Sequence, residues 1–199
     1  MIANYASALN AAHDAAAGQH YPSGALYVVA TPIGNLADIT LRALHVLKLA
    51  ESIACEDTRH TQTLLRAYGI DKAASQLLAV HQHNEAEAAT QVIARLAQGQ
   101  RVAYVSDAGT PGISDPGFLL ARACQRRGVR VECLPGATAL IPALVNSGLP
   151  CDTFHFEGFL PHKKGRQTRW KAIAEEDKTV VLYESPHRIV KTMEQALEF

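Results

Sequence analysis

The stretch SDAGTPGISDPG (106–117) has the residue types and spacing best suited to binding a ligand. It directly follows an apolar segment, so Ser106 and Asp107 would lie at the carboxyl edge of a strand, where open parallel sheets bind ligands. Glycine lets a backbone approach a ligand closely, and proline fixes the shape of a loop. An ordinary turn between a strand and a helix explains this stretch alone equally well. It is neither a dinucleotide fingerprint nor a phosphate loop, because GxGxxG and GxxxxGK[ST] are absent.

Two further loops rich in proline and glycine follow apolar segments in the same way. They are TPIGNL (31–36) and LPGAT (134–138). Since the carboxyl ends of parallel strands meet at one edge of a sheet, the three loops predict a cleft lined by backbone amides and carbonyls. Such a cleft suits a small polar ligand.

The elements that would position these loops alternate between strands and helices. Five strand-like runs lie at 25–31, 52–57, 77–81, 101–107 and 130–135, and helical patterns such as 38–50 and 85–98 lie between them. This alternation predicts an α/β fold, an open parallel sheet with helices on both faces.

A second, smaller unit is expected beyond Gly148 and Pro150, which end a helical pattern. We expect strands at 153–160 and 179–185 in a unit too small to be stable alone, so this α/β domain is expected to be incomplete. The expected organisation is a flexible leader over 1–23, an N-terminal α/β domain over 24–147, a linker over 148–152 and the start of a C-terminal α/β domain over 153–199.

The composition excludes several classes of protein. With 48% hydrophobic and 19% charged residues, the 199-residue chain is not disordered throughout. Its 19 basic residues balance 19 acidic ones, so nucleic acid would be bound only by a local patch. The four cysteines are widely spaced, and no apolar run approaches the ~20 residues of a membrane helix. We expect a cytoplasmic protein with no metal and no membrane contact.

The local basic patch is HKKGRQTRWK (162–171), which contains no acidic residue. Basic and aromatic side chains together hold phosphates and stack on unpaired bases, so the stretch predicts RNA binding. The expected RNA-binding residues are Lys163, Lys164, Arg166 and Arg169. The alternative is a solvated loop that leads into a helix, with Trp170 in the core.

Six motifs in order carry a resemblance to a known family: TPIGNLADIT (31–40), EDTRHT (56–61), SDAGTPGISDPG (106–117), LPGATA (134–139), EGFLP (157–161) and YESPHR (183–188). From Leu26 onward the chain resembles the ribosomal RNA branch of the tetrapyrrole methylase superfamily. The resemblance implies two α/β domains, S-adenosyl-L-methionine as cofactor and a homodimer. It also implies 2′-O-methylation of a cytidine ribose in the 16S rRNA of the small ribosomal subunit.

The resemblance also implies which residues surround the cofactor: Pro32, Ser106, Asp107, Ala108, Gly109, Ile113, Ser114, Pro135, Gly136 and Ala137. Asp107 would attract the ammonium or sulfonium charge of the cofactor, and the alternative role for Asp107 is a turn or helix cap. Members that modify tetrapyrroles typically carry a GxGxG-type loop after the first strand. The TPIGNL loop in its place argues against a tetrapyrrole substrate.

A ribose hydroxyl is a poor nucleophile at neutral pH, so a nearby proton acceptor would help the transfer. The candidates are Glu56, Asp57 and His60, with His81 and His83 as alternatives. A structural role for EDTRHT is equally open, in which Asp57 caps a helix and pairs with an arginine. The histidine segment 81–85 is interpreted as an RNA-facing or solvated loop rather than a metal pair.

Two other functions remain open from the sequence. One is a methyltransferase acting on a small tetrapyrrole, which the absent GxGxG loop and the basic stretch disfavour. The other is a noncatalytic module that binds RNA or a nucleotide.

Overall fold

The computed structural model describes residues 5, 7–81, 84–114 and 117–199. The chain forms two compact units, which we call unit 1 (Met1–Thr138) and unit 2 (Ala139–Phe199). The division falls before helix α6 (Leu140–Ser147), whereas the sequence pattern places the boundary after it. Gly148, in the left-handed conformation at φ 70°, is the C-cap of α6. The predicted break at Gly148 therefore marks the end of a helix.

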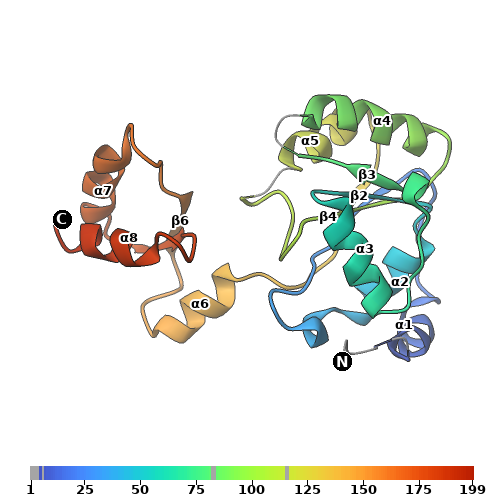
Figure 1. Ribbon diagram of the computed structural model, residues 1–199, viewed down its shortest axis with the longest axis horizontal. Coiled ribbons are helices and arrows are strands. Elements are labelled where there is room, and N and C mark those ends of the chain that lie inside the picture. The colour runs from blue at the N-terminus through green and yellow to red at the C-terminus, as the bar shows by residue number, and fades with distance from the viewer. Residues whose placement is uncertain (1–4, 6, 82–83, 115–116) are drawn as a thin grey trace. The chain divides into compact units, whose positions relative to one another are not determined.

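Unit 1 is built on a five-stranded parallel sheet, which confirms the predicted α/β fold (Figure 1). The strand order is β3-β2-β4-β1-β5. The strands are β1 (Leu26–Val28), β2 (Ser52–Cys55), β3 (Leu77–Ala79), β4 (Val102–Val105) and β5 (Val131–Cys133). Each of them lies within one of the five predicted runs. Because all strands are parallel, the loops that follow β1, β4 and β5 leave the sheet at the same edge.

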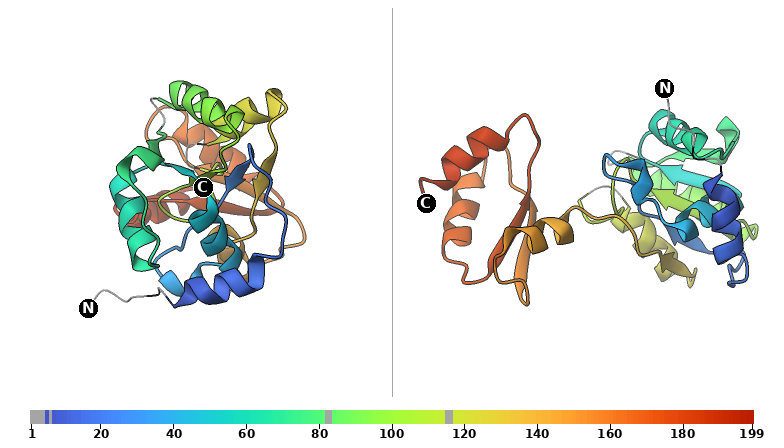
Figure 2. Two further views of the ribbon diagram at one scale, coloured as in Figure 1. Left: turned by 90° about the vertical axis from the view of Figure 1, so that its right-hand side faces the viewer. Right: turned by 90° about the horizontal axis from the view of Figure 1, so that it is seen from below.

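Helices cover both faces of this sheet (Figures 1 and 2). Alternate side chains of each strand enter opposite cores, so Tyr27 and Ile53 join one cluster while Leu26 and Ala54 join the other. The first cluster packs under α1 (Ala8–Ala16), α2 (Leu41–Leu49) and α3 (Thr58–Ala67), and the second under α4 (Glu85–Ala97) and α5 (Phe118–Arg126). Two short 3₁₀ turns, η1 (Leu36–Asp38) and η2 (Ala74–Gln76), complete the unit.

The N-terminal segment differs from the flexible leader that the sequence predicts. Residues 8–16 form α1, which packs against α2. Leu9, Ala12 and Ala16 are spaced by three and four residues and are all buried. The polar residues Asn10 and His13 lie on the exposed face, so the segment is an amphipathic helix.

Unit 2 contains α6, a parallel pair of strands and two further helices. The strands β6 (Phe154–Phe159) and β7 (Thr179–Tyr183) lie within the two predicted runs, and α7 (Arg166–Ala174) connects them. Helix α8 (Ile189–Ala196) lies beside α7 (Figure 2), and the ring of Trp170 on α7 stacks on that of Phe199 at 6.4 Å. Across the described ranges of both units, the helices are too short or too polar to span a membrane.

Candidate functional site

The loops that follow β1 and β4 are joined by hydrogen bonds at the carboxyl edge of the sheet in unit 1. The Thr31 N–H donates to the Gly109 carbonyl at 3.0 Å, and the Gly109 N–H donates to the Thr31 carbonyl at 2.9 Å. The buried Thr31 hydroxyl also donates to the Ser106 carbonyl at 3.1 Å. These contacts fix the start of the SDAGTPGISDPG segment against the TPIGNL loop.

The loop that follows β5 lies against the same place. The Thr110 hydroxyl donates to the Ala137 carbonyl at 2.9 Å. Gly136 passes so close to Ala30 that an added Cβ would lie 2.8 Å from the Ala30 Cβ. The structure therefore brings together all three loops that the sequence singles out.

Gly109 is required by this junction itself. Its φ of +83° is in the left-handed region, and an added Cβ would lie 3.3 Å from the Ile33 Cδ1 atom. A larger residue here would strain the backbone and push the Ile33 side chain aside. The glycine is thus explained by contacts within the protein, without any ligand.

The ten residues predicted around a cofactor divide by exposure. Pro32, Ser106 and Gly109 are buried inside the junction, whereas Ile113 is 54% exposed. The Asp107 carboxylate is partly buried and accepts a hydrogen bond from the Asp57 N–H at 3.3 Å. The Ser114 hydroxyl oxygen is buried and has no hydrogen-bond partner among the described residues. Asp115 and Pro116 of the same motif lie outside the described residues.

The end of the SDAGTPGISDPG segment is held by a residue that the sequence patterns did not reveal. The buried Glu85 carboxylate oxygen Oε1 accepts hydrogen bonds from the N–H groups of Gly117, Leu119 and Leu120 at 2.8, 2.9 and 3.2 Å. Glu85 begins α4, and the three N–H groups begin α5. Because this cap comes from a remote helix, no local sequence pattern around α5 could have predicted it.

The EDTRHT segment forms the start of α3. The Asp57 carboxylate accepts from the N–H groups of Arg59 and His60 at 2.8 and 3.4 Å, and its other oxygen lies 3.0 Å from Arg59 Nη2. The Arg59 side chain and N–H lower the pKa of Asp57 to about 2. Asp57 is therefore a helix cap held in an ion pair.

The other candidate proton acceptors lie at different exposures. Glu56 is partly buried, and His60 is exposed on the first turn of α3. His81 is exposed, and His83 lies outside the described residues.

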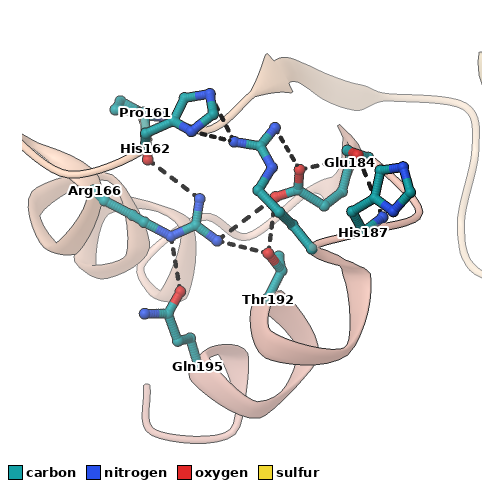
Figure 3. Close-up of polar contacts among 9 residues, drawn as sticks. Pro161, His162, Arg166, Glu184, His187, Thr192 and Gln195 are labelled. Carbon is teal, nitrogen blue, oxygen red and sulfur yellow. Dashed lines mark hydrogen bonds and ion pairs between the residues drawn. The ribbon is translucent and has the colours of Figure 1, made fainter.

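The basic stretch of unit 2 separates into exposed and buried parts. Lys163 and Lys164 are exposed, and Arg169 forms an ion pair with Glu157 at 2.9 Å. Arg166, the remaining expected RNA-binding residue, is buried, and its guanidinium donates to Gln195, Thr192 and the Pro161 carbonyl (Figure 3). Trp170 is also buried, so the interpretation as a core residue fits and stacking on a base does not.

No cluster of three or more His, Cys, Asp or Glu side chains that could hold a metal ion occurs in the described part of the chain. His81 of the histidine segment 81–85 is therefore not in such a cluster among the described residues. Toward a ligand, the arrangement at the sheet edge offers backbone groups, the Asp107 carboxylate and the Ser114 hydroxyl.

The fold and the loop junction define a class of protein. The chain belongs to the family of Tetrapyrrole (Corrin/Porphyrin) Methylases, whose model matches residues 25–199. Among solved structures, it is 25% identical to uroporphyrin-III-C-methyltransferase from Thermus thermophilus, with a TM-score of 0.58, covering 88% of this chain and 74% of that one. The cobalt precorrin-4 methyltransferase structure, 20% identical, shares the fold with a TM-score of 0.64 over 90% of this chain and 78% of that one.

More similar relatives carry a more particular name. The chain is 54% identical over 172 residues to ribosomal RNA small subunit methyltransferase I of Escherichia coli O157:H7, covering 86% of this chain and 59% of that protein. The protein of the same name from Haemophilus influenzae is 54% identical over 173 residues, covering 86% of this chain and 60% of its own length. The chain thus spans about 60% of the length of these relatives.

Proposed function

We propose that this chain belongs to an S-adenosyl-L-methionine-dependent methyltransferase that 2′-O-methylates a cytidine ribose in the 16S rRNA of the small ribosomal subunit. The observation that carries the proposal is the 54% identity to relatives named ribosomal RNA small subunit methyltransferase I over 86% of the chain. The small subunit and its rRNA are the proposed substrate and partner, which places the reaction in the cytoplasm.

The three-loop junction of unit 1 is the proposed cofactor site. When bound, S-adenosyl-L-methionine supplies a methyl group activated by its sulfonium. The buried Ser114 hydroxyl without a described partner fits a polar group of such a ligand, and the Asp107 carboxylate fits a positive one. Exposed Ile113 offers an apolar contact at the same loop. The remaining proposed contacts come from the sheet-edge loops: Pro32, Ser106, Ala108, Gly109, Pro135, Gly136 and Ala137.

Proton handling is proposed for the start of α3. With its pKa lowered to about 2 and its oxygens bonded to Arg59 and helix N–H groups, Asp57 is a weak base. Its proposed role is to position the strand end through its own N–H, which donates to Asp107. Glu56 and His60 are the proposed acceptors for the ribose proton.

RNA contact is proposed for the exposed Lys163 and Lys164 and for the partly exposed Arg169. Neutralising the two lysines should weaken RNA binding and flatten its salt dependence, because fewer phosphates would be neutralised. Cofactor affinity should stay unchanged, since neither lysine is among the proposed cofactor contacts. An unaltered salt slope would assign them to a solvated loop.

The test of the function is methyl transfer to purified small subunits, with nuclease digestion and mass spectrometry of the nucleosides. The expected product is 2′-O-methylcytidine from 16S rRNA. Transfer to uroporphyrinogen instead would identify a tetrapyrrole enzyme, and binding of RNA without transfer to either would identify a noncatalytic module.

The cofactor site is tested separately by calorimetry. Asp107→Asn should weaken S-adenosyl-L-methionine binding about tenfold, and exposed Asp71→Asn is the matched control.

A homodimer is proposed from the resemblance to this enzyme branch. Light scattering coupled to size-exclusion chromatography tests it. A mass of twice 21.5 kDa is expected for the chain as given, and a mass of 21.5 kDa at all concentrations would contradict the assembly.

A further inference from the structure

Unit 2 contains a buried charge network that none of the functional roles above uses (Figure 3). Glu184 directly follows β7, and its side chain is only 4% exposed. One of its oxygens lies 2.8 Å from Arg188 Nη2 and the other 3.7 Å from Arg166 Nη2. The Thr192 hydroxyl donates to Glu184 at 2.8 Å and accepts from Arg166 at 2.7 Å. One carboxylate thus balances two guanidinium groups.

A pocket of about 120 Å³ opens beside this network. It is lined by His162, Arg166, Arg188, Lys191, Thr192 and Gln195. Three of these side chains are cations and none is a carboxylate. Glu184 neutralises only one of the three charges, so the pocket is left with an excess of positive charge. Arg188 is held in place by His162, whose ring nitrogens lie 2.6 and 2.7 Å from Arg188 Nη1.

A second cavity of about 380 Å³ adjoins this pocket and shares His162, Arg166 and Gln195 with it. Its lining adds the exposed Lys163 and a single acidic residue, Glu198. The positive surface therefore continues from the pocket toward the basic stretch 162–171.

We infer that the 120 Å³ pocket binds a phosphate group. The planar guanidinium group of an arginine can donate two N–H groups to the oxygens of one phosphate. Because such a group is already held by other side chains, it loses little side-chain entropy on binding. Arg166 is held by Gln195, Thr192 and Pro161, and Arg188 by Glu184 and His162, so both guanidinium groups are preorganised. The pocket volume of about 120 Å³ is about four times the ~30 Å³ that one water molecule fills in the liquid, so a phosphate and its oxygens have room.

The phosphate is assigned to the backbone of a single RNA strand, and this assignment rests on the proposed function. The neighbouring Lys163 and Lys164 would hold the adjacent phosphates. Arg166 then contributes through the pocket, although it is too buried to meet RNA on the open surface. Inorganic phosphate has the same chemistry and is the second source that the experiment separates.

The first arm measures binding of a fluorescently labelled single-stranded RNA by anisotropy at several salt concentrations. Lys191 is exposed and lines the pocket, so Lys191→Gln removes a charge without disturbing the fold. We expect a several-fold loss of affinity and a salt slope reduced by about 0.7. Lys191→Arg should bind as the wild type does. Lys178→Gln, an exposed lysine of unit 2 outside both cavities, is the control.

The second arm titrates inorganic phosphate at constant ionic strength and follows tryptophan fluorescence. Trp170 is the only tryptophan, and Arg166 Cζ lies 5.9 Å from the centre of its ring, so an anion on Arg166 should change the signal. We expect a saturable change whose midpoint moves to higher phosphate in Lys191→Gln. A saturable change together with unaltered RNA affinity would assign the pocket to free phosphate and overturn the RNA assignment.

The two arms separate this inference from the proposed function. No saturable phosphate response, with RNA affinity equal in wild type and Lys191→Gln, overturns the pocket even where small subunits are methylated. A lower RNA affinity in Lys191→Gln supports the pocket even where no methyl transfer is seen.

Discussion

The two units stabilise their strands in different ways. Every residue of β1, β2 and β4 in unit 1 is buried, because helices cover both faces of the sheet. In unit 2 every residue of β7 is only partly buried, and β6 has exposed positions at both His155 and Phe159. Hydrophobic burial therefore contributes more in the three inner strands of unit 1 than in unit 2, whereas the edge strands β3 and β5 of unit 1 are also only partly buried.

The units also satisfy their buried charges differently. In unit 1, Glu85 accepts from backbone N–H groups of α5, and Lys72 donates to the carbonyls of Lys48 and Ala50 at the end of α2. In unit 2, Arg166 and Glu184 face each other. The buried charges of unit 1 thus hold backbone groups in place, whereas those of unit 2 neutralise one another. Removing a charged side chain leaves backbone groups without a partner in unit 1, and a buried charge without its counter-charge in unit 2.

The largest expected effect comes from the apolar core of unit 1. Ile53→Ala should destabilise the protein by about 4 kcal/mol, because the fully buried side chain leaves a cavity between the sheet and its helices. Val181→Ala on partly buried β7 is the counterpart and should cost about 1 kcal/mol. Denaturant unfolding followed by circular dichroism measures both. Equal losses would show that the strands of the two units are stabilised alike.

The apolar strands explain why much of the fold of unit 1 was predictable. The runs around β1, β2 and β4 are apolar on both faces, as a sheet covered by two helix layers requires, and this pattern is local. Helix α1 was missed because its small buried residues, Ala12 and Ala16, carry little hydrophobic signal amid polar neighbours. Strand order could not be predicted, since β1 pairs with β4 and β5 rather than with β2.

The candidate site was predictable only where its residues are adjacent in sequence. The three Pro/Gly loops were found because parallel strands bring such loops to one edge. Glu85 was missed because it caps a helix more than thirty residues away. The burial of Arg166 could not be predicted, because its basic neighbours are exposed and its partners Thr192 and Gln195 lie on α8. Long-range polar contacts of this kind leave no periodic pattern.

The second largest effect is expected from the charge network of unit 2. Glu184→Ala should cost about 3 kcal/mol, because two buried or partly buried guanidinium groups lose their shared carboxylate. Glu184→Gln keeps the shape of the side chain and one acceptor oxygen, so it should cost less. Trp170 fluorescence during denaturation reports this loss in unit 2 directly. A Glu184→Ala variant as stable as the wild type would show that the arginines do not depend on Glu184.

An intermediate effect is expected at the cap between α4 and α5. Glu85→Ala should cost about 2 kcal/mol, because three N–H groups at the start of α5 lose their acceptor. It should also weaken S-adenosyl-L-methionine binding, since α5 anchors the end of the 106–117 loop. Glu87→Ala, an exposed position on the same first turn of α4, is the control. Thermal melting measures the stability of both variants, and calorimetry measures their cofactor affinity. Equal melting temperatures and equal affinities would show that Glu85 does not support the cofactor site.

The smallest effect is an acid sensitivity confined to unit 2. Burial raises the pKa of Glu184, but the hydrogen bonds from Thr192 and the Ser185 N–H, with the charges of Arg188 and Arg166, outweigh it and hold the pKa below its ordinary value of 4.5. A carboxyl whose pKa is lowered by folding contributes stability that is fully present above its unfolded value. That stability is lost as the pH falls through the folded value.

The wild type should therefore lose melting temperature, followed by Trp170 fluorescence, as the pH falls from about 5 to about 3. Glu184→Gln has no proton to take up at this position, so its melting temperature should fall less over the same range. The difference between the two slopes isolates Glu184 from carboxylates such as Glu176, whose pKa the Lys178 N–H and His155 also lower. Parallel slopes would mean that the Glu184 pKa is the same in the folded and unfolded chain, and that the arginines are balanced by something other than its charge.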